Sequence, residues 1–512
     1  MTNLMEYLDA AYERAPQKTA FTDGENGLTF GELYNAARSV GTFLSRQGYC
    51  REPVVVFMPK CPETVAAFLG AVCGGCYYVP IDRETPRVRA QMIFERMRPR
   101  AAICSDGETR AAIEGMGPDT GCQAYDYADI SQTAHDAGLL SRIREDAIDT
   151  DPVYTVFTSG STGVPKGVVA NHRSVTDYIE NLSEVLGFDG GTVFGNQAPL
   201  YADACLKELY PTLKYQAVTY LIPKKLFSFP LKLTEYLNRH QINTVCWVPG
   251  ALTMISGYGA LEKDPPRHLK TVAFGGEVFP VSQFNKWRAA LPGTRFFNLY
   301  GPTEATGMSC WYEADRDFGP DEAIPIGRPF RNTGVLLLDG DRPAAPGGTG
   351  EICIRGTCLA MGYWGGHEHA AFCQNPLTAG AYAERIYRTG DLGRYNERGE
   401  LMFVARRDSQ IKHMGHRVEP GEIEAAAMRL NGVSAACCVY DARKRRLALY
   451  YVSGECEGEG ETGVSATALA AHLRDCLPGY MVPHAMTRLD VMPRTPNGKV
   501  DRAAVGQITT NN

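Results

Sequence analysis

Residues 158–168 of the chain read TSGSTGVPKGV and combine three glycines, four hydroxyl side chains and one lysine. Glycines let backbone amides approach an anion closely, while hydroxyls and an ammonium group add donors and positive charge. The stretch follows the apolar run 153–157. It therefore predicts a loop that binds an anionic group, such as a phosphate, at the end of a buried strand.

The spacing of this stretch differs from that of a Walker phosphate loop. A Walker loop reads GxxxxGK[ST], with glycine directly before the lysine and a hydroxyl residue directly after it. Here Gly163 stands three residues before Lys166, and Gly167 follows the lysine. The spacing therefore argues against a kinase or a P-loop ATPase.

TSGSTGVPKG resembles the phosphate loop of the adenylate-forming superfamily, which includes peptide-synthetase adenylation domains, acyl-CoA ligases and luciferases. Further motifs of this superfamily lie in family order along nearly the whole chain. They are LTFGEL (28–33), GGCYYVPID (74–82), NLYGPTEAT (298–306), GEICIRG (350–356), YRTGDL (387–392), ARRDSQIKHMGHRVEPGEIE (405–424), LPGYMVP (477–483) and PNGKVDR (496–502). On these motifs the chain is identified as a member, similar to free-standing amino-acid adenylation enzymes and D-alanine–carrier protein ligases.

The resemblance implies a fold and a reaction. The fold is α/β, with a large N-terminal domain (1–407) of doubly wound sheets plus a small β-barrel subdomain, and a smaller mobile α+β domain (408–512). In the reaction a carboxylate attacks the α-phosphate of ATP, pyrophosphate leaves, and a thiol then displaces AMP. Because the first step joins two anions, the site must supply positive charge and alignment. ATP and Mg²⁺ are the implied cofactors.

The resemblance also assigns the nucleotide site. Lys499 is the implied catalytic lysine, Tyr300 the residue that stacks on adenine, and Asp391 the acceptor for the ribose hydroxyls. Glu304 is the implied magnesium ligand. The implied contacts to ATP or AMP are Thr158, Ser159, Gly160, Ser161, Thr162, Gly163, Lys166, Gly276, Glu277, Asn298, Leu299, Tyr300, Gly301, Thr303, Asp391 and Arg406.

Asp203 in LYADACLKELYPTL is the residue that distinguishes the branches of the superfamily. Amino-acid-activating members place an aspartate there to hold the substrate ammonium, and a desolvated ammonium needs such a partner. The resemblance gives the substrate pocket as Asp203, Ala204, Lys207, Trp247, Ala273, Gly275, Leu299, Gly307 and Met308. Lys207 favours an acidic side chain on the substrate, similar to glutamate-activating pockets. Trp247 favours a small substrate such as glycine or alanine.

The implied second step involves the C-terminal domain. Asp408 is the implied hinge, and Gly415 belongs to the loop that meets the incoming thiol arm. The chain ends eleven residues after Asp501, which leaves no room for a carrier domain. The expected acceptor is therefore the phosphopantetheine arm of a separate carrier protein. Two alternatives stay open, an acyl- or aryl-CoA ligase and a non-catalytic scaffold with the same fold.

Composition excludes several other classes of protein. The formal net charge of −6 argues against a nucleic-acid or membrane-surface binder, since a phosphate backbone is usually met by basic excess. The N-terminus lacks a signal peptide, and glycines and a proline interrupt the uncharged run 64–81, which predicts a buried helix followed by a strand. Cys73 and Cys76 have CxxC spacing without a metal or redox context, so they are expected to be reduced, buried thiols. A cytoplasmic protein is expected.

The elements that must position these residues follow from hydrophobic periodicity. Apolar runs up to about residue 300 alternate with helical patterns, which predicts parallel sheets covered by helices. The predicted strands are 54–58, 154–158, 217–222, 243–248 and 271–274. Beyond about residue 320, short strands between glycine and proline turns predict an antiparallel β subdomain. After residue 407 the chain predicts an α+β domain with a helix opened by Pro420 and an acidic surface loop at 454–463.

Overall fold

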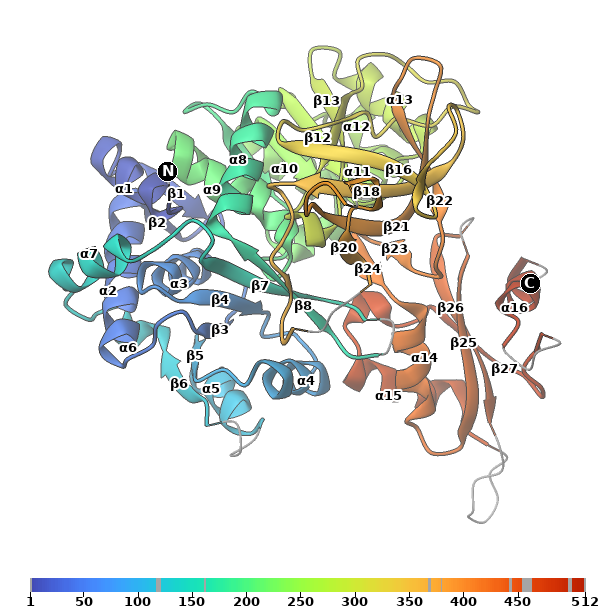
Figure 1. Cartoon of the computed structure of the whole chain (residues 1–512), viewed down its shortest axis with the longest axis horizontal. Helices are drawn as coiled ribbons and strands as arrows, with labels where there is room; N and C mark the ends of the chain where they lie inside the picture. Colours follow the sequence, from blue (N-terminus) through green and yellow to red (C-terminus); the bar gives the residue numbers. More distant parts are fainter. Residues whose placement is uncertain are drawn as a thin grey trace. The chain divides into compact units, whose positions relative to one another are not determined.

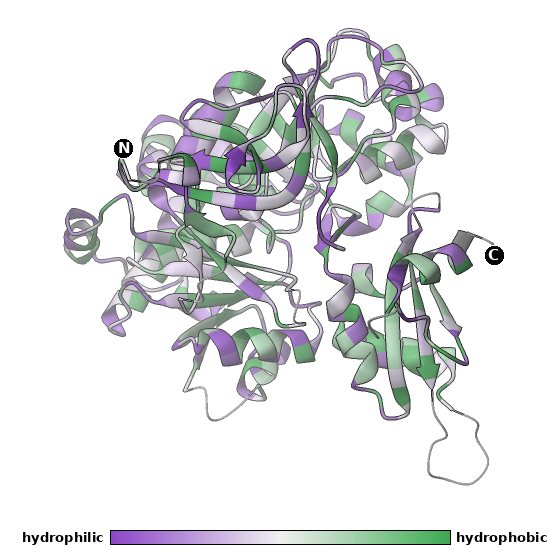
Figure 2. Cartoon of the chain, turned by 45° about the vertical axis from the view of Figure 1, so that its right-hand side comes forward, coloured by the Kyte–Doolittle hydropathy of each residue, from purple (hydrophilic) through white to green (hydrophobic). Residues whose placement is uncertain are grey.

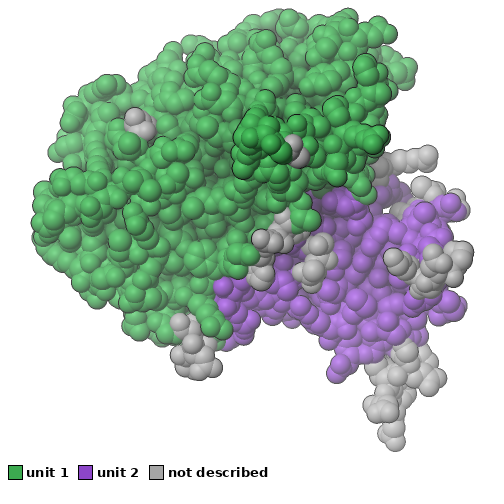
Figure 3. All heavy atoms as spheres, viewed as in Figure 1, with its two compact units in different colours: residues 1–83, 97–156, 167–407 green, residues 84–96, 157–166, 408–512 purple. Residues whose placement is uncertain are grey.

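The computed structural model describes residues 2–116, 121–160, 163–366, 370–378, 380–441, 444–453, 463–495 and 500–510. Its contacts divide the chain into two compact units, drawn in green and purple in Figure 3. Unit 1 comprises residues 1–83, 97–156 and 167–407, and unit 2 comprises residues 84–96, 157–166 and 408–512. The predicted loop 454–463 falls largely outside the described residues.

The largest sheet of unit 1 is nine-stranded and mostly parallel (Figure 1). In spatial order its strands are β15 (Arg328–Pro329), β14 (Cys310–Glu313), β13 (Arg295–Tyr300), β12 (Thr271–Gly275), β11 (Thr244–Trp247), β9 (Val193–Asn196), β10 (Val218–Leu221), β1 (Thr19–Thr22) and β2 (Gly27–Thr29). Parallel strands β9 to β13 end at the same edge, so the residues that follow them gather there.

A second sheet has seven strands and is parallel at its centre. Its order is β19 (Gly362–Tyr363), β8 (Lys166–Asn171), β7 (Pro152–Thr158), β4 (Tyr77–Ile81), β3 (Pro53–Phe57), β5 (Ala101–Cys104) and β6 (Gln123–Asp126). β3 and β4 are buried along their whole length, as expected for a strand covered on both faces. The predicted helix and strand within 64–81 are α3 (Pro62–Cys73) and β4, which confirms that prediction.

Helices cover both faces of the nine-stranded sheet. One hydrophobic cluster joins the strands to α1 (Met5–Arg14), α2 (Phe30–Arg46), α3, α8 (His172–Leu186) and α9 (Leu206–Tyr215). A separate cluster on the other face contains residues of α10 (Pro230–Arg239), α11 (Pro249–Gly257), α12 (Ala260–Lys263) and α13 (Val281–Ala290). Figure 2 shows the hydrophobic residues along the strands and the inward helix faces. This arrangement confirms the predicted doubly wound α/β fold.

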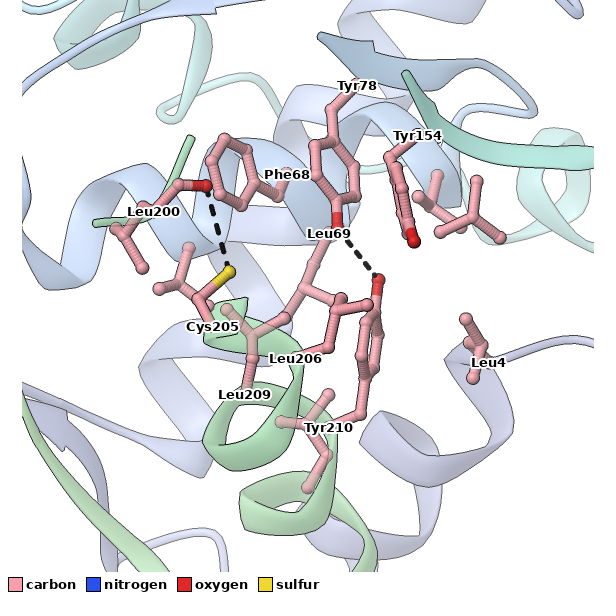
Figure 4. Packing of buried hydrophobic residues seen from close by; sticks show 14 of the residues in the cluster. Leu4, Phe68, Leu69, Tyr78, Tyr154, Leu200, Cys205, Leu206, Leu209 and Tyr210 are labelled. Carbon is pink, nitrogen blue, oxygen red and sulfur yellow. Dashed lines mark hydrogen bonds between the residues drawn. The ribbon is translucent and has the colours of Figure 1, made fainter. Parts of the chain in front are cut away.

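Helix α9 is buried along most of its length. Leu206, Leu209 and Tyr210 point into the cluster, where the Tyr210 and Tyr78 hydroxyls lie 3.4 Å apart (Figure 4). The thiol of Cys205, directly before the helix, donates to the carbonyl of Leu200. Lys207 and Glu208 share this burial. The helix therefore carries charged side chains into the interior of unit 1.

The third sheet of unit 1 is antiparallel, which confirms the predicted β subdomain. Its order is β17 (Arg342–Pro343), β16 (Thr333–Asp339), β18 (Gly350–Gly356), β21 (Arg385–Tyr395) and β20 (Phe372–Gln374), with β22 (Leu401–Arg406) paired to β21. The remaining helices of unit 1 are α5 (Gly107–Glu114), α6 (Tyr127–Ile130), α7 (Ala137–Glu145) and the short 3-10 turns η2 (Asp203–Cys205), η3 (Lys224–Ser228), η4 (Thr303–Ala305) and η5 (Pro376–Thr378).

Unit 2 has its own hydrophobic core, built from α14, α15 and a three-stranded sheet. The sheet pairs β25 (Val433–Asp441) with β26 (Arg446–Ser453) and β26 with β27 (Ala485–Arg488). Its other elements are α4 (Arg87–Met97, of which 97 belongs to unit 1), β23 (Ile411–His413), β24 (His416–Val418), α14 (Pro420–Met428), α15 (Ala466–Cys476), η6 (Gly479–Met481) and α16 (Arg502–Thr510). Helix α14 begins at Pro420, as the sequence predicts.

We predict that Thr29→Ala destabilises unit 1 by about 1 kcal/mol, because Thr29 caps α2. Its hydroxyl accepts from the Glu32 amide, and the Glu32 carboxylate accepts from the Thr29 amide at 2.8 Å. Urea unfolding should show a lower midpoint. Ser282→Ala is the matched control, since Ser282 is an exposed residue of α13 whose hydroxyl bonds to none of the described residues. Equal midpoints for both variants would contradict the capping role.

Candidate active site

Asp391 is the centre of a buried hydrogen-bonded group in unit 1. The register of β21 and β22 sets Asp391 opposite Arg406, whose Nη1 donates to Asp391 Oδ1 at 2.6 Å. The hydroxyl of Tyr300, at the end of β13, donates to Oδ2 at 2.6 Å. Burial and the Asp391 carboxylate raise the pKa of Tyr300, so its hydroxyl stays a donor. A carboxylate oxygen accepts more than one hydrogen bond, so Asp391 can also receive those of a diol.

Asn298 and Gly276 are two further predicted nucleotide contacts. Asn298 has an acceptor atom that no described residue uses, and Gly276 borders open space. Asn298 donates through Nδ2 to the Pro325 carbonyl at 2.8 Å, and its Oδ1 accepts from none of the described residues. That oxygen suits an exocyclic amine. Gly276 has a φ of +83°, and a Cβ at this position would meet nothing within 4 Å. The glycine therefore borders open space.

The predicted phosphate loop belongs to unit 2 up to Lys166. Gly160 is required by the turn, since a Cβ there would lie 2.1 Å from the Val164 carbonyl oxygen. The Ser159 hydroxyl donates to the Arg417 carbonyl at 2.6 Å. Gly163 has a positive φ, Thr158 ends β7 and Lys166 begins β8. Ser161 and Thr162 lie outside the described residues, as does Lys499.

Asp203 lies in η2, directly before helix α9, where the positive end of the helix dipole favours an anion. Burial raises the pKa of its carboxyl, and the Thr303 hydroxyl and the charge of Lys207 oppose that shift. Thr303, predicted as a nucleotide contact, is thus a neighbour of the predicted ammonium-binding residue. A substrate ammonium would stabilise the ionised form of Asp203 in the same way as Lys207 does.

Lys207 is the least compensated charge in this region. It is 5% exposed, and the described residues provide it with no hydrogen bond or ion pair. Burial raises the pKa values of Asp203 and Glu208, and the positive charge of Lys207 opposes that rise. Burying an ammonium group without a bonded partner is costly. The geometry therefore leaves the Lys207 side chain to bind an additional anion.

Glu208 is a buried charge and Lys60 a half-buried one, and the sequence indicated neither. Burial raises the pKa of Glu208 to about 7, although Lys207 and Lys60 oppose the shift. Burial likewise lowers the pKa of Lys60 to about 7, although Glu208 opposes that shift. The Lys60 Nζ donates to three strand-end carbonyls, those of Asn196 (3.0 Å), Gln197 (3.3 Å) and Ile222 (3.4 Å). A lysine three residues after the end of the buried strand β3 was the available sequence signal.

The predicted pocket residues separate into two groups. Ala204, Ala273, Leu299 and Met308 belong to the same hydrophobic cluster as α9. Trp247 instead belongs to the cluster on the other face of the sheet, and its Nε1 donates to the Gly195 carbonyl at 2.6 Å. The residues of a strand alternate between faces, so Cys246, one residue earlier, shares the α9 cluster.

Three of the predicted site glycines have packing reasons to be glycine. A Cβ at Gly275 would lie 2.3 Å from the Leu299 carbonyl oxygen of the neighbouring strand. Gly307 has a φ of +94°, and its Cβ would press on the Tyr178 ring at 3.0 Å. A Cβ at Gly301 would meet the backbone of residues 307–309 at 2.5–2.6 Å. Glycine at 275 therefore carries no information about the substrate.

Glu304 is fully buried in η4, and its Oε1 accepts from the Tyr363 hydroxyl at 2.6 Å. Tyr363 is a neighbour that sequence reasoning missed. Among the described residues no group of three or more His, Cys, Asp or Glu side chains is arranged to hold a metal. Glu304 alone fits the role of one hard oxygen ligand for a Mg²⁺ ion whose other ligands are phosphates and water. Glu277 is half-buried after β12.

The predicted thiol-side residue Gly415 lies in a tight hairpin of unit 2. β23 and β24 pair across the two-residue turn Met414–Gly415, where both residues have positive φ, as a type I′ turn requires. Asp408 is the residue at which unit 2 resumes after Arg407, and its Oδ1 accepts from the Gln410 amide. Its hinge role stays a prediction.

The cysteines of the described residues are free thiols. Burial raises the pKa of Cys73 to about 11 and that of Cys76 to about 12. Both thiols are thus protonated near neutral pH. Cys76 is buried, as predicted, whereas Cys73 is only partly buried.

Comparison with known proteins assigns the family. The profile described as AMP-binding enzyme matches residues 8–364, and the profile described as AMP-binding enzyme C-terminal domain matches residues 422–499. The chain belongs to the AMP-binding enzyme family. The resemblance drawn from the sequence motifs is therefore confirmed.

Curated relatives of this AMP-binding enzyme include a carrier-protein ligase and a tyrocidine synthase. It is 33% identical over 505 residues to L-proline–[L-prolyl-carrier protein] ligase of Streptomyces coelicolor, covering 94% of this chain and 92% of the relative. It is 30% identical to tyrocidine synthase 1 of Brevibacillus parabrevis, covering 98% of this chain but 44% of the relative. The AMP-binding enzyme thus spans less than half of that synthase.

A solved structure shares the fold. NpsA-ThdA, an artificially fused adenylation–PCP di-domain from Klebsiella oxytoca, matches with a TM-score of 0.81 at 19% identity, covering 96% of this chain and 94% of that chain. No helix within the described part of the AMP-binding enzyme is long and apolar enough to cross a membrane.

We predict that Gly275→Ala destabilises unit 1 by about 1–3 kcal/mol, because the added Cβ forces β12 away from the Leu299 carbonyl. Thermal unfolding should show a lower midpoint. Gly293→Ala is the matched control, since a Cβ there meets nothing within 4 Å. A stable Gly275→Ala variant with an altered substrate preference would instead support a pocket role for this position.

Proposed function

We propose that this AMP-binding enzyme activates an amino acid with an acidic side chain and transfers it to the thiol of a carrier protein. The observation that carries the acidic preference is the buried ammonium of Lys207, which has no hydrogen bond or ion pair within the described residues. The 33% identity to an aminoacyl–carrier protein ligase supports the amino-acid and carrier parts of the proposal. Asp203 is the proposed partner of the substrate ammonium.

Two charges of opposite sign orient such a substrate. Asp203 binds its ammonium, and Lys207 binds its side-chain carboxylate, so the α-carboxylate remains to react. One of its oxygens bonds to the α-phosphorus of ATP, and the α–β phosphoanhydride bond breaks to release pyrophosphate. The carrier thiol, losing its proton, then bonds to the acyl carbon as the bond to AMP breaks. Asp391, Arg406 and Tyr300 are the proposed ribose and adenine contacts.

Positive charge for the first step comes from two proposed sources. Lys499, by its place in PNGKVDR, is proposed to contact the reacting carboxylate and phosphate oxygens. Mg²⁺, when bound with ATP, would neutralise phosphate charge, and Glu304 would be its protein ligand. Asp408 is the proposed hinge between the N-terminal adenylation core and the C-terminal domain. A cytoplasmic location and the absence of nucleic-acid partners also remain proposals.

The position of Trp247 weakens the case for a small substrate. Its indole packs against Phe227 with ring centres 5.2 Å apart, on the other face of the sheet from Ala273 and Leu299. The sequence predicted that Trp247 fills the substrate pocket, whereas its side chain packs against Phe227. An acidic substrate is therefore the better supported of the two.

We predict amino-acid-dependent exchange of labelled pyrophosphate into ATP, with an acidic amino acid the best substrate in a broad panel. Lys499→Ala should lower the exchange rate by at least about a hundredfold, because one positioned cation is removed from the transition state. Lys286→Ala, at an exposed position of α13, is the control and should retain the rate. Exchange supported only by fatty or aromatic acids would overturn the amino-acid proposal in favour of a CoA ligase.

We predict that Lys207→Met removes the preference for acidic over neutral amino acids. Loss of one partner of a buried charge pair costs about 2–5 kcal/mol, so kcat/KM for the acidic substrate should fall at least about thirtyfold. Neutral amino acids of similar size should react comparably well or better. The control is Lys263→Met, at an exposed lysine of α12. An unchanged preference in Lys207→Met would remove the charge-pairing argument.

A further inference from the structure

Two buried acceptor atoms without partners lie on the joined side chains of Asn196 and Glu208. Asn196 Nδ2 donates to Glu208 Oε2 at 3.2 Å, and both residues are 1% exposed. Asn196 Oδ1 and Glu208 Oε1 accept no hydrogen bond from any described residue. Each of these atoms shares a carbon with an atom of the existing hydrogen bond, so the two oxygens meet when the carboxamide and the carboxyl group lie in one plane. A buried acceptor without a hydrogen bond destabilises the folded protein, because it has lost its bonds to water.

We propose that Glu208 is a neutral carboxylic acid that donates its Oε1 proton to Asn196 Oδ1, forming a two-hydrogen-bond pair with the carboxamide. One proton then satisfies both orphan atoms. This inference rests on the proposed function, because a neutral Glu208 leaves the charge of Lys207 to the substrate. Glu208 is thus a positioning residue for substrate specificity, acting through Lys207.

The neighbours of Glu208 are compatible with a neutral acid. Lys60 faces it from the segment before α3, but its three ammonium hydrogens already have the carbonyls of Asn196, Gln197 and Ile222 as acceptors. The other titratable or charged groups around it are Lys207, Asp203, Cys205, Cys246 and Tyr178. Burial raises the pKa values of the two thiols and the phenol, which therefore remain neutral.

Charge balance connects this proton to substrate binding. With Glu208 neutral, no carboxylate directly beside Lys207 in the helix competes for its ammonium group, which is then available to the side-chain carboxylate of an acidic amino acid. When Glu208 ionises, its carboxylate competes with the substrate for Lys207. Binding of the acidic side chain is therefore linked to one proton on Glu208.

The test is the pH dependence of KM for the best amino acid in pyrophosphate exchange, between about pH 6 and 8.5, where a substrate carboxyl is already ionised. Burial raises the pKa of Glu208 to about 7, so the wild-type KM should be flat below that pH and rise above it. One linked proton gives a KM about tenfold higher at pH 8. Glu208→Gln places an N–H where the proton stood, so its KM at pH 8 should be about tenfold lower than that of the wild type.

Two matched variants sharpen this test. Glu180→Gln removes a carboxylate of α8 that pairs with Lys214, and it should keep the wild-type pH profile. Lys60→Met removes a nearby cation, which raises the pKa of Glu208 and should move the rise in KM to higher pH. A wild-type pH profile in Glu208→Gln, or a KM lowered equally at every pH in that variant, would overturn the proposal.

Infrared difference spectroscopy supplies a measurement independent of activity. At pH 6 the wild type should show a protonated carboxylic acid band that Glu208→Gln lacks and Glu180→Gln retains. Absence of that difference would overturn the proposal. If no amino acid supports exchange, the proposed function fails, while the infrared comparison still decides whether Glu208 carries a proton.

Discussion

The compensation of buried charge at the start of helix α9 is the constraint on which the substrate site depends. Helix α9 is packed by hydrophobic residues on the face of Leu206, Leu209 and Tyr210, so Lys207 and Glu208 enter the interior with it. In that environment a buried ammonium group needs a bonded partner, and a buried carboxylate needs either a bonded partner or a proton that neutralises it. Lys60 donates hydrogen bonds to strand-end carbonyls, and the proposed acid–amide pair neutralises Glu208. In the proposed function, the partner of Lys207 is the substrate.

A different principle organises the nucleotide side. Asp391 and Arg406 are brought together by the register of two antiparallel strands, and Tyr300 joins them from the end of a parallel strand. The three side chains form a pre-organised group that holds its own hydrogen bonds. Such rigidity suits a site that recognises the part of ATP that does not react. In the proposed function, the reacting end of the substrate is held by the charged residues instead.

The sequence predicted the fold because its hydrophobic pattern is consistent at every scale. Continuous apolar runs such as 54–58 became buried parallel strands, and the run 64–81 became a buried helix and strand. Predicting the pocket was harder. Trp247 and Cys246 are adjacent, and the face that each side chain meets depends on the register of β11 with its neighbours. Gly275 was predicted as a pocket residue, but the close approach of the Leu299 carbonyl already accounts for the glycine.

By itself, the sequence determined the family and predicted Asp203 and Lys207, because short motifs hold those residues at fixed local spacing. Only the tertiary structure decided how the charges are compensated. Lys60 lies 148 residues before Glu208 in the chain, and Asn196 lies on a strand that the helix packs beside. Packing of the sheets and helices brings these side chains into one dry interior. There, removal from water makes the position of one proton part of the recognition of the substrate.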